Sequence, residues 1–263
     1  MDQFLTDYFK RINYTGSTDV SSETLYGLHT CHTLNVPFEN LDVYNQKPIF
    51  LDKESLYKKI VHNKRGGYCF EMNGLFSFVL KELGFKVTDL LARVHYGDTF
   101  GPKVHQALLV EIQDEKWLVD VGFGRDGIIA PLLIQVGIDQ QQFTQTYRLL
   151  TDPEFGFVLQ IKIGDNYCPM YAFKPEACYP VDFMVSSHFT STSPTSIFVI
   201  KMFCTKPTPE GRITLVGDTL KVTTNGQVFE STIENEAEYH RLLKEYFALD
   251  SDNVDVSKMF LAE

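Results

Sequence analysis

Polar and apolar residues along the first 85 positions recur with the period of a helix. Ser21 can cap a helix in which Leu25 and Leu28 occupy one face. Asp52 is a candidate N-cap for a second helix within residues 51–63. The first third of the chain is therefore expected to be helical.

The most regular apolar stripe of the chain follows Cys69. Its members recur three and four positions apart and are Leu75, Phe76, Val79, Leu80 and Leu83. Gly84 comes directly after them, and glycine commonly follows the last turn of a helix. The pattern predicts a helix with Cys69 at its start.

From Lys86 onward the pattern changes to that of strands. The segments expected to be strands are 86–96, 104–113, 115–123, 146–150, 155–163, 196–203 and 212–222. The short polar turn at 113–116 makes the second and third of these hairpin neighbours, and Asn225-Gly226 predicts a further hairpin of type I′. Helical spacing returns at 235–249. The outline is an α+β fold with a helical part at 1–85, a β-rich part at 86–190 and a mixed part at 191–263.

Composition narrows the class of protein. Of 263 residues 44% are hydrophobic and 22% charged, which is ordinary for a globular chain. No apolar run approaches the roughly 18 residues that span a bilayer, and the N-terminus lacks the apolar region of a signal peptide. A cytoplasmic protein that does not act at a membrane is therefore expected. The net charge of −10 argues against nucleic acid as a partner.

The five cysteines are odd in number, widely spaced and form no CxxC pair, so neither a disulfide framework nor a zinc ribbon is indicated. Among them Cys69 has a special position. It follows Gly66-Gly67 and starts a helix, where unpaired backbone N–H groups and the helix dipole favour a thiolate. The alternative is a small buried apolar residue.

Two further residues complete a possible catalytic group. His105 shares a strand face with Ala107 and Leu109, where it is either catalytic or an ordinary core residue. Asp120 lies in an apolar strand and is costly to bury without a partner, although it could also turn to solvent at the strand end. Pairing around the 113–116 turn brings Asp120 close to His105. Cys69, His105 and Asp120 thus match a nucleophile, a base and the residue that orients the base.

Several motifs resemble those of arylamine N-acetyltransferases. RGGYCFEMN (65–73) resembles the signature around the nucleophile of that family, and VPFENLD (36–42) its N-terminal motif. VHQALLV, LVDVGFG and TSPTS (192–196) are similar to further family segments in the same order. The resemblance covers at least residues 20–205.

The resemblance implies a fold and a reaction. The fold would comprise a helical bundle carrying the nucleophile, a β-barrel-like middle domain carrying His105 and Asp120, and an α/β lid, with a cysteine-proteinase-like core. The reaction would be ping-pong acetyl transfer from acetyl-CoA, through Cys69, to arylamines or arylhydrazines. His105 would act as acid and base, Asp120 would orient it, and no metal would take part.

The resemblance also suggests binding residues. Phe38, Phe123 and Phe189 would line an aromatic pocket, although ordinary core packing is an equal alternative for them. The coenzyme A contacts implied are Gly101, Thr195 and Ser196, with Lys103, Arg125 and Lys201 as possible partners for phosphate. The chain ends soon after its last expected helix, as in bacterial-type members, and lacks the C-terminal segment that covers the cofactor in vertebrate members.

Two other patterns are not read as sites. Gly122, Gly124 and Gly127 spell GxGxxG, but Pro131 interrupts the following run and no acidic residue falls about 20 positions on, so a turn is expected. His29 and His32 share a helix face near Cys31, yet two ligands without a third do not predict a metal site.

Two alternative functions remain. A thiol hydrolase or transglutaminase uses the same Cys, His and Asp order, and only the PFENL and TSPTS motifs favour acetyl transfer over it. A member that binds a ligand without catalysis is disfavoured, since all three triad residues are present.

Overall fold

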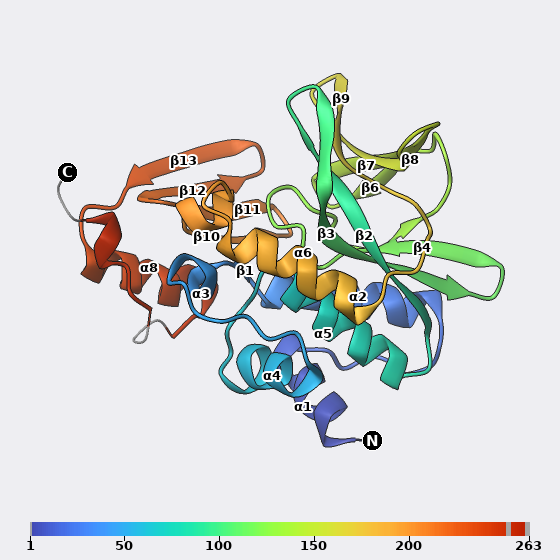
Figure 1. The fold of residues 1–263 in the computed structure, drawn as a ribbon, viewed down its shortest axis with the longest axis horizontal. Coiled ribbons are helices and arrows are strands. Elements are labelled where there is room, and N and C mark those ends of the chain that lie inside the picture. The colour runs from blue at the N-terminus through green and yellow to red at the C-terminus, as the bar shows by residue number, and fades with distance from the viewer. Residues whose placement is uncertain (1, 251–253, 261–263) are drawn as a thin grey trace.

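A computed structural model describes residues 2–250 and 254–260. Figure 1 shows the N-terminal helices beneath, an eight-stranded sheet at the upper right, and a five-stranded sheet with the last long helix at the left. The protein is thus a mixed helix and sheet structure. None of the helices in the described part of the chain combines the length and the apolar character that a membrane crossing requires.

Three of the N-terminal helices begin where the sequence predicts. The N-terminal helices are α1 (Gln3–Ile12), α2 (Ser22–Asn35), α3 (Leu41–Tyr44), α4 (Lys53–Leu56) with a π-helical continuation (Tyr57–His62), and α5 (Cys69–Glu82). The Ser21 hydroxyl accepts the backbone N–H of Thr24, and the Asp52 carboxylate accepts that of Ser55. Past the end of α5, Gly84 has φ +92°, a value that glycine adopts at no steric cost. The predicted starts of α2, α4 and α5 are confirmed, whereas α1 and α3 had no predicted start.

The eight-stranded sheet curls into a nearly closed barrel. Its strands are β2 (Lys86–Tyr96), β3 (Thr99–Ile112), β4 (Glu115–Val119), β5 (Leu132–Leu133), β6 (Gln140–Gln142), β7 (Gln145–Asp152), β8 (Gly156–Ile163) and β9 (Asn166–Phe173). They follow the order β5-β4-β3-β2-β9-β8-β7-β6. At the two edges, the Gln140 side chain accepts the Leu133 N–H and donates to its carbonyl, both at 2.9 Å. A side chain thereby bridges the gap that the strands leave open.

The two faces of β3 serve two cores. Ala107 and Leu109 point into the barrel, whereas Leu108 and Val110 pack against α1, α2 and α5. Because successive side chains of β3 point to opposite faces, this one strand packs against both the barrel interior and the helices. The same alternation turns His105, two positions before Ala107, toward the barrel side.

The five-stranded sheet joins a short strand that follows α2 to four strands from the last quarter of the sequence. Its order is β1 (Phe38–Glu39), β10 (Phe203–Thr208), β11 (Gly211–Val216), β12 (Thr219–Thr224) and β13 (Gln227–Thr232), and α8 (Glu236–Phe247) packs on it. Asn225 and Gly226 both have positive φ, so the predicted hairpin is confirmed. Beside β1, the Asn40 amide donates to the carbonyls of Phe198 and Lys201 and accepts the Phe203 N–H.

Two predicted strands differ from the structure. The segment 212–222 is not one strand, because a turn at 217–218 divides it into β11 and β12. Within 196–203, residues Ile197–Ile200 form the short helix α7, and only Phe203 belongs to a strand. A short apolar run does not distinguish helix from strand by itself, and here Ser196 lies at the N-cap position after a turn at Pro194. Helix α6 (Pro180–Thr192), which the sequence pattern did not single out, leads into this turn.

Candidate active site

Cys69 is the first residue of α5, and its side chain is almost fully buried. It packs in a small apolar cluster with Phe38, Tyr68, Phe70 and Leu91. Phe183 of α6 covers the same cluster from the other side. The thiol thus lies at the N-terminal end of a 14-residue helix in a largely water-free setting, where the helix dipole stabilises negative charge.

The β3–β4 hairpin brings His105 and Asp120 together. The register pairs Leu108 with Val119, so that Asp120 follows at the level of Ala107, as expected from the sequence. His105 Nε2 lies 2.7 Å from Asp120 Oδ2, and both side chains are buried. With Nε2 bonded to the carboxylate, Nδ1 is the ring nitrogen left for Cys69, whose thiol donates to the carbonyl of the preceding residue, Val104, at 3.8 Å.

His105 and Asp120 each stabilise the charged form of the other. Burial alone would lower the pKa of His105, but the negative charge of Asp120 and hydrogen bonds with Asp120 and Cys69 raise it to about 10. Burial tends to raise the pKa of Asp120, and the opposing charge and hydrogen bond of His105 lower it overall. At neutral pH the site therefore holds an imidazolium facing a carboxylate.

Asn73 holds the carboxylate from the other side. Its side-chain N–H groups donate to Asp120 Oδ1 at 2.9 Å and to the Gln106 carbonyl at 2.6 Å, and its oxygen accepts the Val121 N–H. Asn73 lies one turn after Cys69 on α5, so one helix carries Cys69 and also holds the side chain of Asp120. The sequence did not reveal this role, because the partners of Asn73 come from β3 and from the loop after β4, both distant in sequence.

Gly122 allows the chain after Asp120 to pass close to Cys69. A Cβ atom there would lie 2.9 Å from Cys69 Cα and 2.8 Å from Asn73 Nδ2. No helix follows Gly127, so the expectation of a turn is confirmed for this GxGxxG sequence. Glycine here serves close packing of backbone on backbone.

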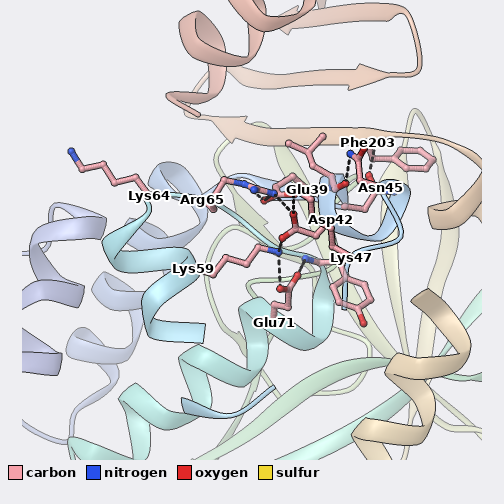
Figure 2. Close-up of polar contacts among 12 residues, drawn as sticks. Glu39, Asp42, Asn45, Lys47, Lys59, Lys64, Arg65, Glu71 and Phe203 are labelled. Atoms are coloured by element: carbon pink, nitrogen blue, oxygen red, sulfur yellow. Dashed lines mark hydrogen bonds and ion pairs between the residues drawn. The ribbon is translucent and has the colours of Figure 1, made fainter. Parts of the chain in front are cut away.

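A network of five charged side chains supports the start of α5 (Figure 2). Arg65 pairs with Glu39 at 2.8 Å and with Asp42 at 3.3 Å, and Lys59 lies 2.7 Å from both Asp42 and Glu71. Glu71 also accepts the backbone N–H of Tyr68, the residue before Cys69.

The network explains the charged residues of two motifs. Glu39 comes from VPFENLD, whereas Arg65 and Glu71 come from RGGYCFEMN. Burial raises the pKa of Glu71, and the nearby Lys59 charge opposes that rise. The paired charges therefore hold the segment before the nucleophile without leaving a carboxylate isolated.

The three phenylalanines predicted to line a pocket have different environments. Phe38 packs against Phe198 in the Cys69 cluster, with ring centroids 5.9 Å apart. Phe123 packs edge-on against the ring of His105, with 5.2 Å between centroids. Phe189 of α6 is 50% exposed, so it lies outside the packed group around Cys69. The structure thus brings Phe38 and Phe123 to the triad and leaves Phe189 at the surface.

The predicted coenzyme A contacts lie on two segments. Gly101 is in β3 near the β2–β3 turn, where its carbonyl accepts a hydrogen bond from Arg93 at 2.9 Å. Thr195 and Ser196 lie in the turn between α6 and α7, and the Ser196 hydroxyl donates to the Thr190 carbonyl. Thr195 is exposed. Helix α6 packs against β3, which links the two segments.

The two histidines of α2 form hydrogen bonds, although Nε2 of His32 is buried without a partner. His32 shares one with the Tyr8 hydroxyl at 2.6 Å, and His29 lies between the backbone of Ile129 and that of Asp120. Among residues 2–250 and 254–260, no three His, Cys, Asp or Glu side chains are arranged to hold a metal ion.

Comparison with known proteins gives the same family throughout. The sequence model of the N-acetyltransferase family matches residues 21–256. An arylamine N-acetyltransferase of Escherichia coli (strain K12) is 35% identical over 96% of this chain and 91% of that protein. The structure of the Salmonella typhimurium arylamine N-acetyltransferase superposes with a TM-score of 0.93 at 31% identity, over 100% of both chains. That of the Mycobacterium marinum enzyme in complex with CoA has a TM-score of 0.90 at 35% identity, over 97% of this chain and 96% of that one. The chain therefore belongs to the arylamine N-acetyltransferase family and is an acetyltransferase.

Proposed function

We propose that the protein transfers acetyl groups from acetyl-CoA to arylamines and arylhydrazines by a ping-pong mechanism through an acetyl-Cys69 intermediate. The observation that carries the proposal is the buried pair of His105 Nε2 and Asp120 Oδ2, 2.7 Å apart, next to Cys69, whose thiol donates to the carbonyl of Val104, the residue before His105. Three residues from helix α5, strand β3 and the loop after β4 converge there, in the arrangement that covalent catalysis requires.

The first half of the reaction acylates the enzyme. The Cys69 thiolate, paired with the His105 imidazolium, attacks the acetyl carbonyl of the thioester. The bond to the sulfur of coenzyme A breaks, and that sulfur leaves with the proton of His105. The first N–H groups of α5 have no acceptor within the helix, and they supply donors for the oxyanion.

The second half returns the enzyme to its starting state. The amine nitrogen attacks the acetyl-cysteine, and the now neutral His105 takes up the proton that the nitrogen loses. The bond between the carbonyl carbon and Cys69 Sγ then breaks and regenerates the thiolate. Asp120 keeps the imidazole ring oriented throughout and stabilises its charged form.

The substrates follow from the relatives and from the residues around the site. The matched relatives are named arylamine N-acetyltransferases, and one matched structure is a complex with CoA. Phe38 and Phe123 offer aromatic surfaces beside Cys69 for a flat amine. We assign Phe189 to the outer rim of this pocket, and Gly101, Thr195 and Ser196 to coenzyme A.

The layout of the chain is part of the same proposal. Residues 1–85 would form the helical unit with the nucleophile, 86–190 the barrel with His105 and Asp120, and 191–263 the lid, around a cysteine-proteinase-like core. Separate apolar clusters in the helices, the barrel and the C-terminal sheet support this division. Independence from metal, nucleic acid and membranes, and a cytoplasmic location, stay predictions from the sequence.

Peptide mass spectrometry after incubation with acetyl-CoA tests the mechanism. An acetyl group is expected on Cys69, and subsequent addition of an arylamine should remove it and yield the N-acetylated amine. The exposed Cys168 serves as an internal control for non-enzymatic acetylation, and a Cys69→Ala variant should gain nothing. Acetylation elsewhere, or none, would refute the ping-pong mechanism. Loss of the acetyl group to water at the same rate with and without amine would identify a thiol hydrolase.

A further inference from the structure

One buried histidine close to the triad has no part in the mechanism above. His29 lies on α2 and its side chain is fully buried. Its Nδ1 is 2.9 Å from the carbonyl oxygen of Ile129, and its Nε2 accepts the backbone N–H of Asp120 at 3.2 Å. Both contacts reach across more than 90 positions of sequence.

These contacts permit a single protonation state. A carbonyl oxygen only accepts hydrogen bonds and a backbone N–H only donates them, so the proton must sit on Nδ1 and Nε2 must be bare. In an imidazolium, Nε2 would also carry a proton, and its N–H would face the backbone N–H of Asp120 with no acceptor between them. Burial lowers the pKa of His29 to about 4, although the Ile129 carbonyl and the Asp120 charge oppose this shift. The ring therefore stays neutral at physiological pH.

The His29 ring forms hydrogen bonds with the backbone at both ends of one loop. Strand β4 ends at Val119, and the chain then turns through residues 120–129 before it reaches β5. This loop begins with Asp120 and includes Gly122 and Phe123. Asn73 holds the Asp120 carboxylate, but His29 holds its backbone, so the side chain is fixed at both ends.

We propose that His29 is a positioning residue of the triad: its neutral Nδ1–H form fixes the backbone of Asp120 and thereby aims the carboxylate at Nε2 of His105. The inference rests on the proposed function, because it assigns His29 a role in that same site. It predicts that loss of the two contacts weakens the His105–Asp120 pair while Cys69 and His105 themselves remain unchanged.

Two substitutions and one control test the role. His29→Met fills a similar volume without donor or acceptor, whereas His29→Gln can supply both. Thr33→Val is the matched control, since the Thr33 hydroxyl, on the same helix, also lies 2.9 Å from the Ile129 carbonyl but does not bond Asp120. Thermal unfolding reports the stability of each variant.

The decisive measurement is the rate of Cys69 alkylation by iodoacetamide as a function of pH, followed by peptide mass spectrometry. In the wild type the alkaline inflection reports loss of the His105 proton. His29→Met should move it to lower pH, toward its position in Asp120→Asn, and should lower kcat for arylamine acetylation by on the order of tenfold to a hundredfold with little change in KM. His29→Gln and Thr33→Val should keep the wild-type inflection.

Wild-type inflection and kcat in a folded His29→Met would overturn the proposal, as would an equal shift in Thr33→Val. NMR of protein with ¹⁵N-labelled histidine provides a second test that needs no variant: His29 is expected as the neutral Nδ1–H tautomer at pH 7, and either other form would overturn the proposal. If wild-type Cys69 takes up no acetyl group, the proposed function fails. The NMR result then still decides whether His29 holds the Asp120 backbone.

Discussion

A Cβ atom on Gly122 would lie 2.9 Å from the Cα of Cys69 and 3.1 Å from its carbonyl oxygen. The backbone of Gly122 does not lie in the left-handed region, so alanine would meet no conformational strain there. The constraint comes only from the packing of one backbone against another. Backbone atoms of a helix start cannot move aside as a flexible side chain can.

Gly122→Ala is therefore expected to displace Cys69 or the Asp120 loop. The single-turnover rate of Cys69 acetylation by acetyl-CoA should fall on the order of tenfold or more, since small displacements of reacting groups are costly. Gly74→Ala is the matched control on α5, because its nearest neighbour is the flexible Leu56 methyl at 3.2 Å. An unchanged rate in Gly122→Ala would contradict the close packing.

The His105–Asp120 pair predicts a pH dependence of stability. The pKa of His105 rises from 6.5 in the unfolded chain to about 10 in the fold, so its contribution is complete below pH 6.5 and disappears as the pH rises through 10. The pKa of Asp120 is lowered, so its contribution is complete above pH 3.8 and is lost as the pH falls below that value. The pair thus stabilises most between pH 4 and 6.5.

Thermal unfolding of the wild type and of Asp120→Asn between pH 4 and 10.5 measures this contribution. The difference in Tm should be largest near pH 5–6 and should shrink toward pH 10. A Tm difference that does not vary with pH would show that His105 and Asp120 do not stabilise each other's charged forms.

The charged network beneath α5 predicts a non-additive pair of substitutions. Lys59→Met leaves Asp42 and Glu71 without their shared cation and should lower the free energy of unfolding by roughly 2–4 kcal/mol, somewhat less than for a fully enclosed pair, because 16% of the Lys59 side chain stays exposed. Glu71→Gln should cost less, since an amide oxygen can still accept the Tyr68 N–H.

Urea unfolding of the wild type, the two single variants and the double variant completes a double-mutant cycle for Lys59 and Glu71. The double variant should be more stable than the sum of the single effects predicts. Simple additivity would mean that Lys59 and Glu71 do not stabilise each other.

The phenylalanines predict contrasting effects at the surface and beside the nucleophile. Phe38 is 6% exposed, so Phe38→Ala should cost about 3–5 kcal/mol of stability and raise the KM for arylamines. Phe189→Ala should change stability by less than about 0.5 kcal/mol, since half of its surface is exposed. Steady-state kinetics and urea unfolding measure both, and equal losses in the two variants would make Phe189 part of the packed wall.

Local chemistry made the starts of α2 and α4 and the β3–β4 hairpin predictable from sequence. Ser21 and Asp52 bond N–H groups three residues on, and the short 113–116 turn determines the register that brings Asp120 to His105. In each case the interacting groups are close in sequence, so the local sequence pattern is sufficient to predict the structure.

Contacts between distant segments were not predictable in this way. Asn73 meets Asp120 over 47 positions, and His29 does so over 91. Helix α6 exposes Val185 and Phe189 where an amphipathic helix would bury them, which removes the pattern that identifies a helix. The strand expected at 196–203 failed for a related reason, since its apolar run suits either structure.

The contacts of Asn40 also set an order of events during synthesis. Its amide bonds the carbonyls of Phe198 and Lys201, 158 and 161 positions further along the chain. On the ribosome, the segment with Cys69 emerges long before these partners exist. A nascent chain therefore carries the Cys69 thiol while the adjoining β1–β10 pairing is still unmade, and that pairing forms only after Thr205 has been translated.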